Sequence, residues 1–482
     1  MTARVEPASP LRAGTGRRVL ATGARDAVNA GLAPAAVLAL ALILRLPILT
    51  GGQIDYDEGA YWQSIRALGA GHHLFSEIYS SQPPGFLLLL LPFFNLLGQT
   101  LVAARIGVLL FSLAGLVAVY RIGSLLADRR VGLLAMAVLA ADPISLRESV
   151  AFQADGPAMA LAAVSVAMAL EAGVSGRRWA LLAFLAGGLM ALGVLVKPLA
   201  VAAGPTLLLA LLMPPAPARH RLPGVALAAA GGVVAAAAIL LPLRAEWGPM
   251  WHQAVGFHLS ARGIAVGGLD LYTVETELPL LALGLAGAIV SFRHAPRLLA
   301  LAGLWAACSA LMLALQRPLW PHHLTAAAAA AALLAGGLVR LPALRSLDAR
   351  LVAVPAALLL AAAAGAAVLV HHNQMSDEGL RPAVLGLQAA TAPSDMVVTD
   401  DQYMAALAGR NTPPQLVDTS VVRVASGDLT TQSVEAIAER SGTHAFLFST
   451  GRLLQLTDLN SWVQARSTRR LQLDHQRVLY LP

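Results

Sequence analysis

Long apolar runs alternate with short polar segments over most of the chain. Many of these runs reach about 18 residues or more, which is the length that a helix needs to cross a lipid bilayer. The pattern therefore predicts a polytopic α-helical membrane protein with about 11 transmembrane helices. The expected spans are residues 32–50, 102–126, 131–147, 153–171, 179–196, 199–213, 223–243, 277–292, 297–315, 323–340 and 351–370.

The composition agrees with this class. Of the 482 residues, 57% are hydrophobic and 13% are charged, about half the charged fraction of a soluble globular protein. The net charge of +7 comes with arginines gathered in short loops, such as Arg129–Arg130 and Arg177–Arg178. Membrane proteins keep such loops in the cytoplasm. The charge therefore indicates an orientation in the membrane and does not favour a nucleic-acid partner.

The orientation follows from these arginines. If the N-terminus is cytoplasmic, every arginine-rich loop lies inside, and residues 1–31 form a basic cytoplasmic segment. Residues 84–98 are apolar but short, and counting them as a span would move the arginines outside. We therefore expect a helix at the outer interface there, within a first outer loop at 51–101. The C-terminus then lies outside an inner (plasma) membrane that the chain crosses many times.

Residues 371–482 differ from the rest, because they are more polar and their apolar runs shrink to strand length. The expected strands are residues 396–399, 415–418, 444–450 and 477–481. A helical pattern at 432–440 follows Thr430 and Thr431, either of which is a plausible N-cap. Strands that alternate with helices predict a small extracytoplasmic α/β domain, so residues 32–370 form the transmembrane domain.

Near its start, the first outer loop has the sequence DYDEGAYW (residues 55–62), which places three carboxylates within four positions. An apolar stripe at helical spacing follows, formed by Tyr61, Trp62, Ile65 and Leu68. The stripe predicts a short helix in the membrane interface, with its aromatic rings at headgroup depth. Asp57 and Glu58 lie in its first turn, where the helix dipole favours negative charge. Helix capping alone explains such acids equally well.

Other ionisable residues are expected on the same outer face. They are Arg105, Asp155, Lys197, Arg317, His322 and His323. Ionisable groups at membrane depth are costly and usually serve a function. Each one alone has an ordinary explanation, because basic side chains can extend to the interface and an aspartate can cap a helix. Their common face, opposite the arginine anchors, favours a functional site.

Carboxylates beside cations at this face suit the transfer of a sugar from a polyprenyl phosphate. The cations would stabilise the departing phosphate, and one carboxylate would take the proton of the acceptor hydroxyl. A direct displacement needs a single base and inverts the anomeric centre. A retaining double displacement would need a second carboxylate as nucleophile.

Several motifs occur along the chain in a fixed order. They are the acidic pair Asp57–Glu58, "PPGFLLLL", "AARIG" with Arg105, "DRRVGLLA", and "QADGPAMAL" with Asp155. In this order and spacing the chain resembles the GT-C membrane glycosyltransferases, in the branch of the protein O-mannosyltransferases and the lipid A aminoarabinose transferase. The resemblance covers about residues 32–370 and leaves residues 371–482 without a role.

The resemblance implies a polyprenyl-phosphate sugar donor, with Asp57 as the base and Asp155 as a supporting acid. Glu58 is grouped with these catalytic acids, and Arg105 would contact the lipid phosphate. Relatives often have lysine where this chain has Gln82, so Lys197 could supply the missing charge. The expected substrate-binding set is completed by Arg317, His322 and His323. Some GT-C enzymes outside this branch hold a divalent metal between two acids, which this sequence neither requires nor excludes.

Two other functions remain open at this stage. A transporter or flippase of a lipid-linked or glycan substrate would also need charged groups within the membrane, although paired halves or broken midplane helices are not evident. A scaffold that binds partners through its C-terminal domain would not explain the charges at the membrane face. The sequence does not identify the sugar. The acceptor could be a lipid, a glycan or a protein.

Overall fold

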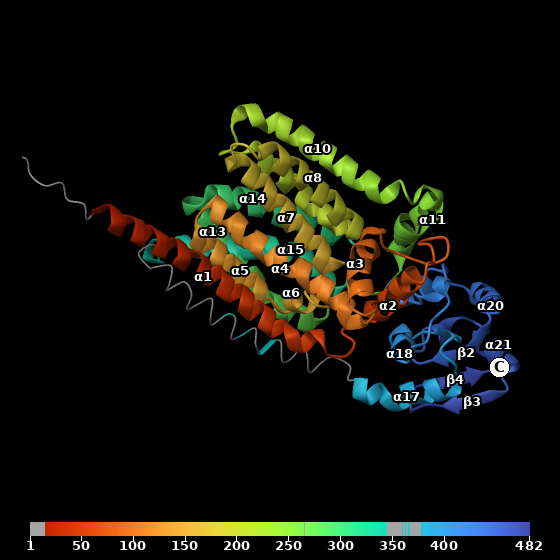
Figure 1. Cartoon of the computed structure of the whole chain (residues 1–482). Helices are drawn as coiled ribbons and strands as arrows, with labels where there is room; N and C mark the ends of the chain where they lie inside the picture. Colours follow the sequence, from red (N-terminus) through yellow and green to blue (C-terminus); the bar gives the residue numbers. More distant parts are fainter. Residues whose placement is uncertain (1–14, 265, 345–358, 360–361, 363–364, 367–376) are drawn as a thin grey trace, which may run out of the picture.

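The structure is a computed structural model, and it describes residues 15–264, 266–344, 359, 362, 365–366 and 377–482. It consists of a bundle of long helices and a smaller α/β domain at one end of that bundle (Figure 1). Helix α2 (Tyr56–Gly69) lies between the two parts.

Eight helical segments of the described chain are long and apolar enough to cross a bilayer. They are α1 (Thr15–Leu49, apolar from Leu32), α4 (Leu101–Leu126), α7 (Asp155–Val174), α8 (Trp179–Val196), α10 (Ala218–Leu240), α13 (Leu271–His294), α14 (Pro296–Leu315), and α15 (Thr325–Gly336) with the 3₁₀ turns that extend it to Pro321 and Arg340. The expected class, a polytopic α-helical membrane protein, is confirmed.

The three other expected spans are not long single helices in the described chain. Residues 131–147 fall in α5 (Arg129–Ala141) and α6 (Pro143–Glu148), because Asp142 caps α6 and proline cannot continue the preceding helix. Residues 199–213 form a 3₁₀ helix at Pro198–Ala203 and then α9 (Gly204–Leu212). The span expected at 351–370 lies almost entirely outside the described residues. The number of 11 spans is therefore not confirmed.

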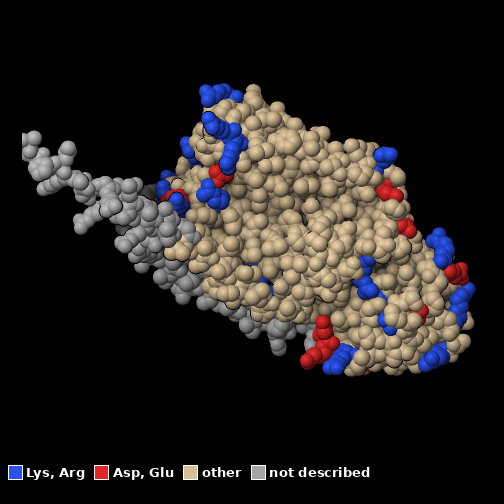
Figure 2. Space-filling view, in the orientation of Figure 1, with Lys and Arg blue, Asp and Glu red and all other residues tan. Residues whose placement is uncertain are grey.

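The outer surface of the bundle is apolar. Val233, Leu285, Ile289 and Phe292 are each more than 60% exposed, which suits contact with lipid tails. Figure 2 shows a broad belt almost without charged residues, with arginines at one end of the bundle and mixed charges around the α/β domain at the other. Arg340 contacts Asp128 at 2.6 Å, which joins two of the loops that were expected to be cytoplasmic.

Small residues let the helices approach closely. A Cβ on Gly187 of α8 would lie 1.8 Å from the carbonyl oxygen of Ala228 in α10, and a Cβ on Gly231 would lie 1.9 Å from that of Phe184. Close backbone approach through small residues is the common packing mode of helices in membranes. The heavy use of glycine and alanine therefore serves the packing of the bundle.

The C-terminal domain has a four-stranded sheet with the order β1-β2-β4-β3. Its strands are β1 (Met396–Thr399), β2 (Thr443–Phe448), β3 (Arg469–Gln472) and β4 (Val478–Leu481), and its helices are α17 (Asp377–Ala390), α18 (Gln402–Leu407), α19 (Val421–Ala425), α20 (Thr431–Arg440) and α21 (Leu459–Arg466). Strands β1 and β2 are parallel, whereas β4 is antiparallel to both of its neighbours. Alternate side chains pack on opposite faces, so Val397 joins the main core and Val398 joins a second cluster with α20 and α21. The predicted α/β domain is confirmed.

Single predictions for this domain had mixed outcomes. The strands expected at 396–399, 444–450 and 477–481 are β1, β2 and β4, and Thr430 caps α20 as expected. The strand at 415–418 was wrong, because Pro414–Leu416 forms a 3₁₀ turn that begins at a proline. Strand β3 was missed, since its sequence Arg-Arg-Leu-Gln has a single apolar residue.

Two short helices of the first outer loop place the site. Helix α2 was expected at this position, but its apolar stripe faces protein: Ile65 is fully buried, and the ring of Trp62 packs on that of Tyr403 from the C-terminal domain at 5.7 Å. The apolar segment at 84–98 is helix α3 (Gly85–Leu96), which is too short to span a bilayer. The longer loop after α10 adds α11 (Trp247–Trp251) and α12 (Phe257–Ser260).

Candidate active site

Helix α2 begins at an aspartate, and its first turn presents a free carboxylate. Asp55 is the N-cap in extended conformation, and its side chain accepts a hydrogen bond from the backbone N–H of Asp57 at 3.2 Å. Asp55 also pairs with Arg147 at 2.6 Å. The carboxylate of Asp57 is half-buried and has no hydrogen-bond or ion-pair partner among the described residues. Capping is therefore done by Asp55, which leaves Asp57 available for chemistry.

Glu58 has a different environment from its neighbour. It is fully buried and accepts two hydrogen bonds from Arg105, at 2.8 and 2.7 Å. Its two oxygens also accept the backbone N–H groups of Ile54 and Phe152. The remaining N–H groups of Arg105 donate to three backbone carbonyls at the end of α1, those of Leu49, Gly51 and Gly52. This pair joins α1, α2 and α4 and has no free group for a substrate.

Asp155 and Lys197 form a second buried pair. Asp155 is the first residue of α7, and one of its oxygens lies 2.5 Å from the Nζ of Lys197, at the end of α8. The two residues are 2% and 6% exposed. The other oxygen of Asp155 is buried without a hydrogen-bond partner among the described groups. Asp155 is the one described partner of Lys197, so two N–H donors of this ammonium remain for a ligand.

The surroundings of Asp57 raise its pKa to about 8. Burial is the largest cause, and the negative charges of Asp55, Asp418 and Asp155 act in the same direction, whereas Lys197 opposes them. A carboxyl group with a pKa near physiological pH suits a general base. The charges of Asp155, Lys197 and Asp418 all act on Asp57. These four residues, of which Asp418 belongs to the C-terminal domain, therefore lie close together. We call Asp57, Asp155, Lys197, His322, His323 and Asp418 the charged cluster.

The two histidines complete this cluster. Both are buried, and their rings meet edge to face with centroids 4.6 Å apart. The backbone N–H of Trp320 donates to Nδ1 of His323 at 3.2 Å, which leaves Nε2 of the neutral ring as the proton-bearing donor. Potential ligand atoms of Asp155, His322 and His323 lie within 4.8 Å of one another. These three residues could therefore hold a metal ion, although Lys197 already occupies one oxygen of Asp155.

The beginning of α3 lies against the end of α8, directly before Lys197. A Cβ on Gly85 would lie 2.6 Å from the carbonyl oxygen of Leu195, so only glycine allows this approach. The N-cap is Pro84, which provides no side-chain hydrogen bond. An uncapped helix N-terminus attracts anions, and here it lies next to a cation. Gln82 precedes it, half-buried and without a described side-chain partner.

An aromatic wall stands beside Asp57. The ring of Tyr61 packs on Phe86 at 4.8 Å and on Phe152 at 6.1 Å. Burial raises the pKa of Tyr61 well above its usual value, and the charge of Asp57 adds to the shift. Tyr61 was expected at headgroup depth, but it lies inside the protein beside the acids.

The C-terminal domain contributes to the site, which the sequence had not indicated. Tyr56 accepts the backbone N–H of Thr419 at 2.9 Å, and the guanidinium of Arg452 stacks on its ring at 3.7 Å. These contacts bring Asp418 close enough to act on the pKa values of Asp57 and Tyr61. No motif around residue 418 could have revealed this, because the contact depends on how the domain docks.

One candidate stands apart from the cluster. Arg317 is exposed, and its guanidinium donates to the adjacent carbonyl of Gln316. Among the described residues it makes no contact with the charged cluster. Its predicted role in substrate binding has no support from this geometry.

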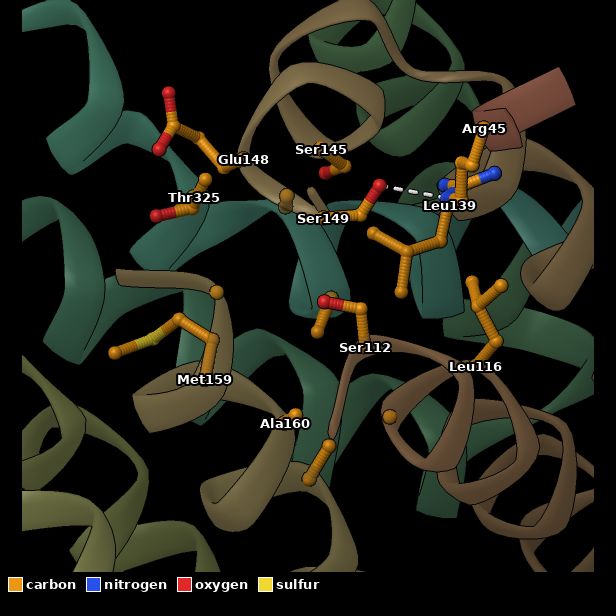
Figure 3. Close-up of a pocket in the computed structure, with 15 residues that line it drawn as sticks. Arg45, Ser112, Leu116, Leu139, Ser145, Glu148, Ser149, Met159, Ala160 and Thr325 are labelled. Atoms are coloured by element: carbon orange, nitrogen blue, oxygen red, sulfur yellow. Dashed lines mark hydrogen bonds between the residues drawn. The ribbon is translucent and has the colours of Figure 1, made fainter. Parts of the chain in front are cut away.

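A small cavity lies deeper in the bundle, between α4, α6, α7 and α15 (Figure 3). Its volume is about 60 Å³, and Arg45 crosses its edge to donate to Ser149 at 2.6 Å. Such a volume has room for a few water molecules. It is too small to hold a sugar.

Comparisons with known proteins agree with this architecture. A family model described as dolichyl-phosphate-mannose-protein mannosyltransferase matches residues 81–242. No curated protein sequence matches the chain. The structure of ArnT from Cupriavidus metallidurans bound to undecaprenyl phosphate superposes with a TM-score of 0.65 at 16% identity, over 92% of this chain and 97% of that one.

Two more distant structures share the architecture. AglB from Archaeoglobus fulgidus, in complex with an inhibitory peptide and a dolichol-phosphate, matches with a TM-score of 0.55 at 13% identity, over 90% of this chain and 72% of that one. The arabinofuranosyltransferase AftD from Mycobacteria matches with a TM-score of 0.52 at 14% identity, over 94% of this chain and 39% of that one. All three are GT-C glycosyltransferases. The chain has the GT-C fold, as the sequence motifs had indicated.

Proposed function

We propose that this protein is an integral-membrane glycosyltransferase. It transfers a sugar from a polyprenyl-phosphate donor to the hydroxyl of an acceptor. The observation that carries the proposal is the free carboxylate of Asp57, whose pKa is about 8, beside the Asp155–Lys197 pair and the uncapped start of α3. The GT-C fold supports a lipid-phosphate donor, since the ArnT and AglB structures hold undecaprenyl phosphate and dolichol-phosphate.

The reaction is a single displacement in which Asp57 is the base. As the acceptor oxygen bonds to the anomeric carbon, the bond from that carbon to the phosphate oxygen breaks. The acceptor proton passes to Asp57, and the polyprenyl phosphate leaves as an anion. A single displacement inverts the anomeric configuration. It needs one base, whereas a retaining double displacement would also need a second carboxylate as nucleophile.

The departing phosphate is stabilised by three features of this chain. Lys197 supplies a charge that is held in place by Asp155, and the beginning of α3 supplies unpaired backbone N–H groups. The proton on Nε2 of His323 is a third donor. Arg105 is not needed as a phosphate contact, because its donors are used by Glu58 and three carbonyls.

The orientation proposed from the sequence fits this site. The arginine-rich ends of the helices lie opposite α2 and the C-terminal domain (Figures 1 and 2). With those ends in the cytoplasm, the charged cluster faces the outside of an inner (plasma) membrane. Nucleotide sugars are absent there, so the donor must be carried by a lipid.

The experiment is to incubate the purified protein with a panel of polyprenyl-phosphate sugars and to measure released polyprenyl phosphate. We expect release with one donor and its loss in Asp57→Asn. Asp458→Asn is the matched control, because Asp458 is exposed and has a positive φ that asparagine tolerates. Full release by Asp57→Asn would show that Asp57 is not the base. If no donor is turned over or bound by the intact protein, the transferase proposal fails.

A further inference from the structure

A second cleft lies between the first outer loop and the C-terminal domain. Its volume is about 710 Å³, which is within the usual size range of ligand sites. The loop contributes Gln53–Tyr56 to one wall. The domain contributes three segments to the others, namely residues 401–402, 448–452 and 476–478.

The cleft lies where α/β domains commonly bind ligands. Strands β1 and β2 are parallel, and the segments that follow them line the cleft. Ligands of such sheets bind outside the carboxyl ends of the strands. Asp400, directly after β1, fixes the turn after β2 by accepting the N–H groups of Ser449 at 2.8 Å and Thr450 at 3.2 Å. The turn is therefore held in shape before any ligand arrives.

Two buried polar atoms of residues that line the cleft have no hydrogen-bond partner among the described residues. They are Oε1 of Gln402 and Nε of Arg452, whereas Nε of Arg477 lies 3.5 Å from a carboxylate oxygen of Asp401. Gln402 is 1% exposed and Arg477 is 8% exposed. Leaving such groups unpaired is costly, and native proteins rarely do so without a functional reason. The polar side chains that line the cleft make its walls suitable for a polar ligand.

The chemistry of the walls narrows the class of that ligand. Three of the four ionised side chains in the walls have a charged partner, because Asp55 pairs with Arg147, and Asp401 lies 3.5 Å from Arg477. The fourth, Arg452, stacks on Tyr56 and donates to the backbone carbonyl of Asp400. The remaining groups are mostly amides and hydroxyls beside two aromatic rings. They are Gln53, Gln402, Gln476, Ser449, Thr450, Phe448 and Tyr56. Most of these groups are bonded within the protein, but the side-chain amide of Gln476 has no partner among the described residues. An amide both donates and accepts hydrogen bonds, as sugar hydroxyls require.

We propose that this cleft binds the saccharide part of a glycan acceptor. The inference rests on the proposed transferase function, and it adds the class of acceptor and where it docks. Asp55 and Tyr56 line the cleft, and the next residue is Asp57. Asp57 itself is not among the lining residues, but its Cα lies about 3.8 Å from that of Tyr56, so a saccharide bound along this wall lies near the helix turn that carries the base.

The first test is direct binding and does not depend on catalysis. The full chain is placed in nanodiscs of sugar-free phospholipid, and neutral glucose and mannose hexasaccharides are added as probes at millimolar concentration. Saturation-transfer NMR should show binding of at least one probe to the wild type. Gln476→Trp should weaken that binding by about tenfold or more, because the indole fills the rim of the cleft. The side chain of Gln476 has no described partner, so the fold should tolerate this change.

The matched control is Gln432→Trp. Gln432 is exposed on α20, outside the cleft, and has no described side-chain partner either. Binding of no probe to the wild type, or equal binding by both variants, would overturn the saccharide assignment. Binding of a probe by the wild type and by Gln432→Trp, with weaker binding by Gln476→Trp, would support the saccharide assignment.

The second test separates this inference from the proposed function. In a transfer assay, Gln476→Trp should raise the KM for the acceptor by about tenfold. Release of polyprenyl phosphate without acceptor, in which water takes the place of the acceptor hydroxyl, should be unchanged. If the enzyme is active but Gln476→Trp and Gln432→Trp have the same KM for the acceptor, the cleft is not the acceptor site, and the transferase function stands. A wild type that neither turns over nor binds any donor would instead refute the transferase function.

Discussion

Arg105 donates two parallel hydrogen bonds to the carboxylate of Glu58, at 2.8 and 2.7 Å, and neither side chain is exposed to solvent. The pair links the end of α1 to α2 and α4, and it therefore fixes the helix that carries Asp57. Two adjacent acids of one motif thus have separate tasks. Glu58 is a structural anchor, whereas Asp57 keeps a free carboxylate.

The first prediction concerns this anchor. Arg105→Ala leaves Glu58 buried without its counter-ion, and breaking such a pair costs about 3–5 kcal/mol. We expect a large loss of thermal stability in detergent, measured by the unfolding midpoint of the purified protein. The matched control is Arg121→Ala on the same helix, whose partly exposed pair with Glu171 should contribute about 1 kcal/mol or less. Equal stability of the two variants would contradict the anchor role, and weak donor binding by a stable Arg105→Ala would restore the phosphate contact expected from the sequence.

The second prediction concerns Lys197. Replacing it with methionine keeps the length of the side chain but removes the charge that faces the departing phosphate. We expect kcat for donor release to fall by about 10²–10³, as when one preorganised donor to a developing charge is lost. Arg178→Met is a control in which an exposed cation is removed from the opposite end of α8. A kcat equal to that of the wild type would remove Lys197 from the reaction.

The third prediction concerns pH. Because the pKa of Asp57 is raised to about 8, mostly by burial, the base is largely protonated at neutral pH. The value of kcat/KM for the donor should therefore rise about tenfold per pH unit below this pKa and level off above it. The measurement is a pH–rate profile of polyprenyl phosphate release. A profile that is flat from pH 6 to 9, or that levels off near pH 4, would contradict the assignment.

The same shift has a consequence for stability, which serves as a control. Between pH 3.8, the usual pKa of an aspartate, and pH 8, about the raised pKa of Asp57, the native state holds a proton that the unfolded chain has lost. Stability therefore decreases as the pH rises through this window. Asp57→Asn cannot lose a proton, so its unfolding midpoint should fall less between pH 6 and 9. An identical pH dependence in wild type and variant would show that Asp57 does not carry the shift.

Much of the membrane domain could be predicted from the sequence, because length and hydropathy alone determine whether a helix can span a bilayer. Prediction became unreliable where one or two residues decide whether a helix ends within an apolar run. Asp142 and Pro143 divide an apolar run into two helices, and the short strand β3 has no hydrophobic pattern. These are local effects that a sliding window cannot resolve.

The candidate site was only partly accessible to sequence reasoning. Ionisable residues in apolar surroundings are conspicuous, so Asp57, Asp155 and Lys197 could be found. Their pairing could not, since Glu58 and Arg105 are 47 positions apart and Lys197 and Asp155 are 42 apart. Asp418 was missed because it approaches the cluster only through the docking of the C-terminal domain.

The fourth prediction concerns this docking. A Cβ on Gly59 would lie 2.5 Å from the backbone nitrogen of Tyr403, so α2 and α18 touch through a glycine. Gly59→Ala should push the domain away and destabilise the protein by about 1–3 kcal/mol, as overpacking does. Limited proteolysis should then release the C-terminal domain faster. Gly176→Ala is the control, because a Cβ there meets nothing within 4 Å. Equal proteolysis of both variants would contradict the contact.

The last prediction concerns His323 and separates a proton donor from a metal ligand. Nδ1 accepts the N–H of Trp320, so the proton of the neutral ring is on Nε2. Glutamine can place an N–H near the position of Nε2, whereas asparagine can only replace the acceptor at Nδ1. We expect His323→Gln to retain more donor release than His323→Asn, with about 10-fold or greater loss in the latter. Chelator treatment should leave the wild type active. The alternative outcome is that chelation abolishes the activity of the wild type, that one divalent ion restores it, and that the ion restores no activity in either variant. This outcome would assign Asp155, His322 and His323 as metal ligands.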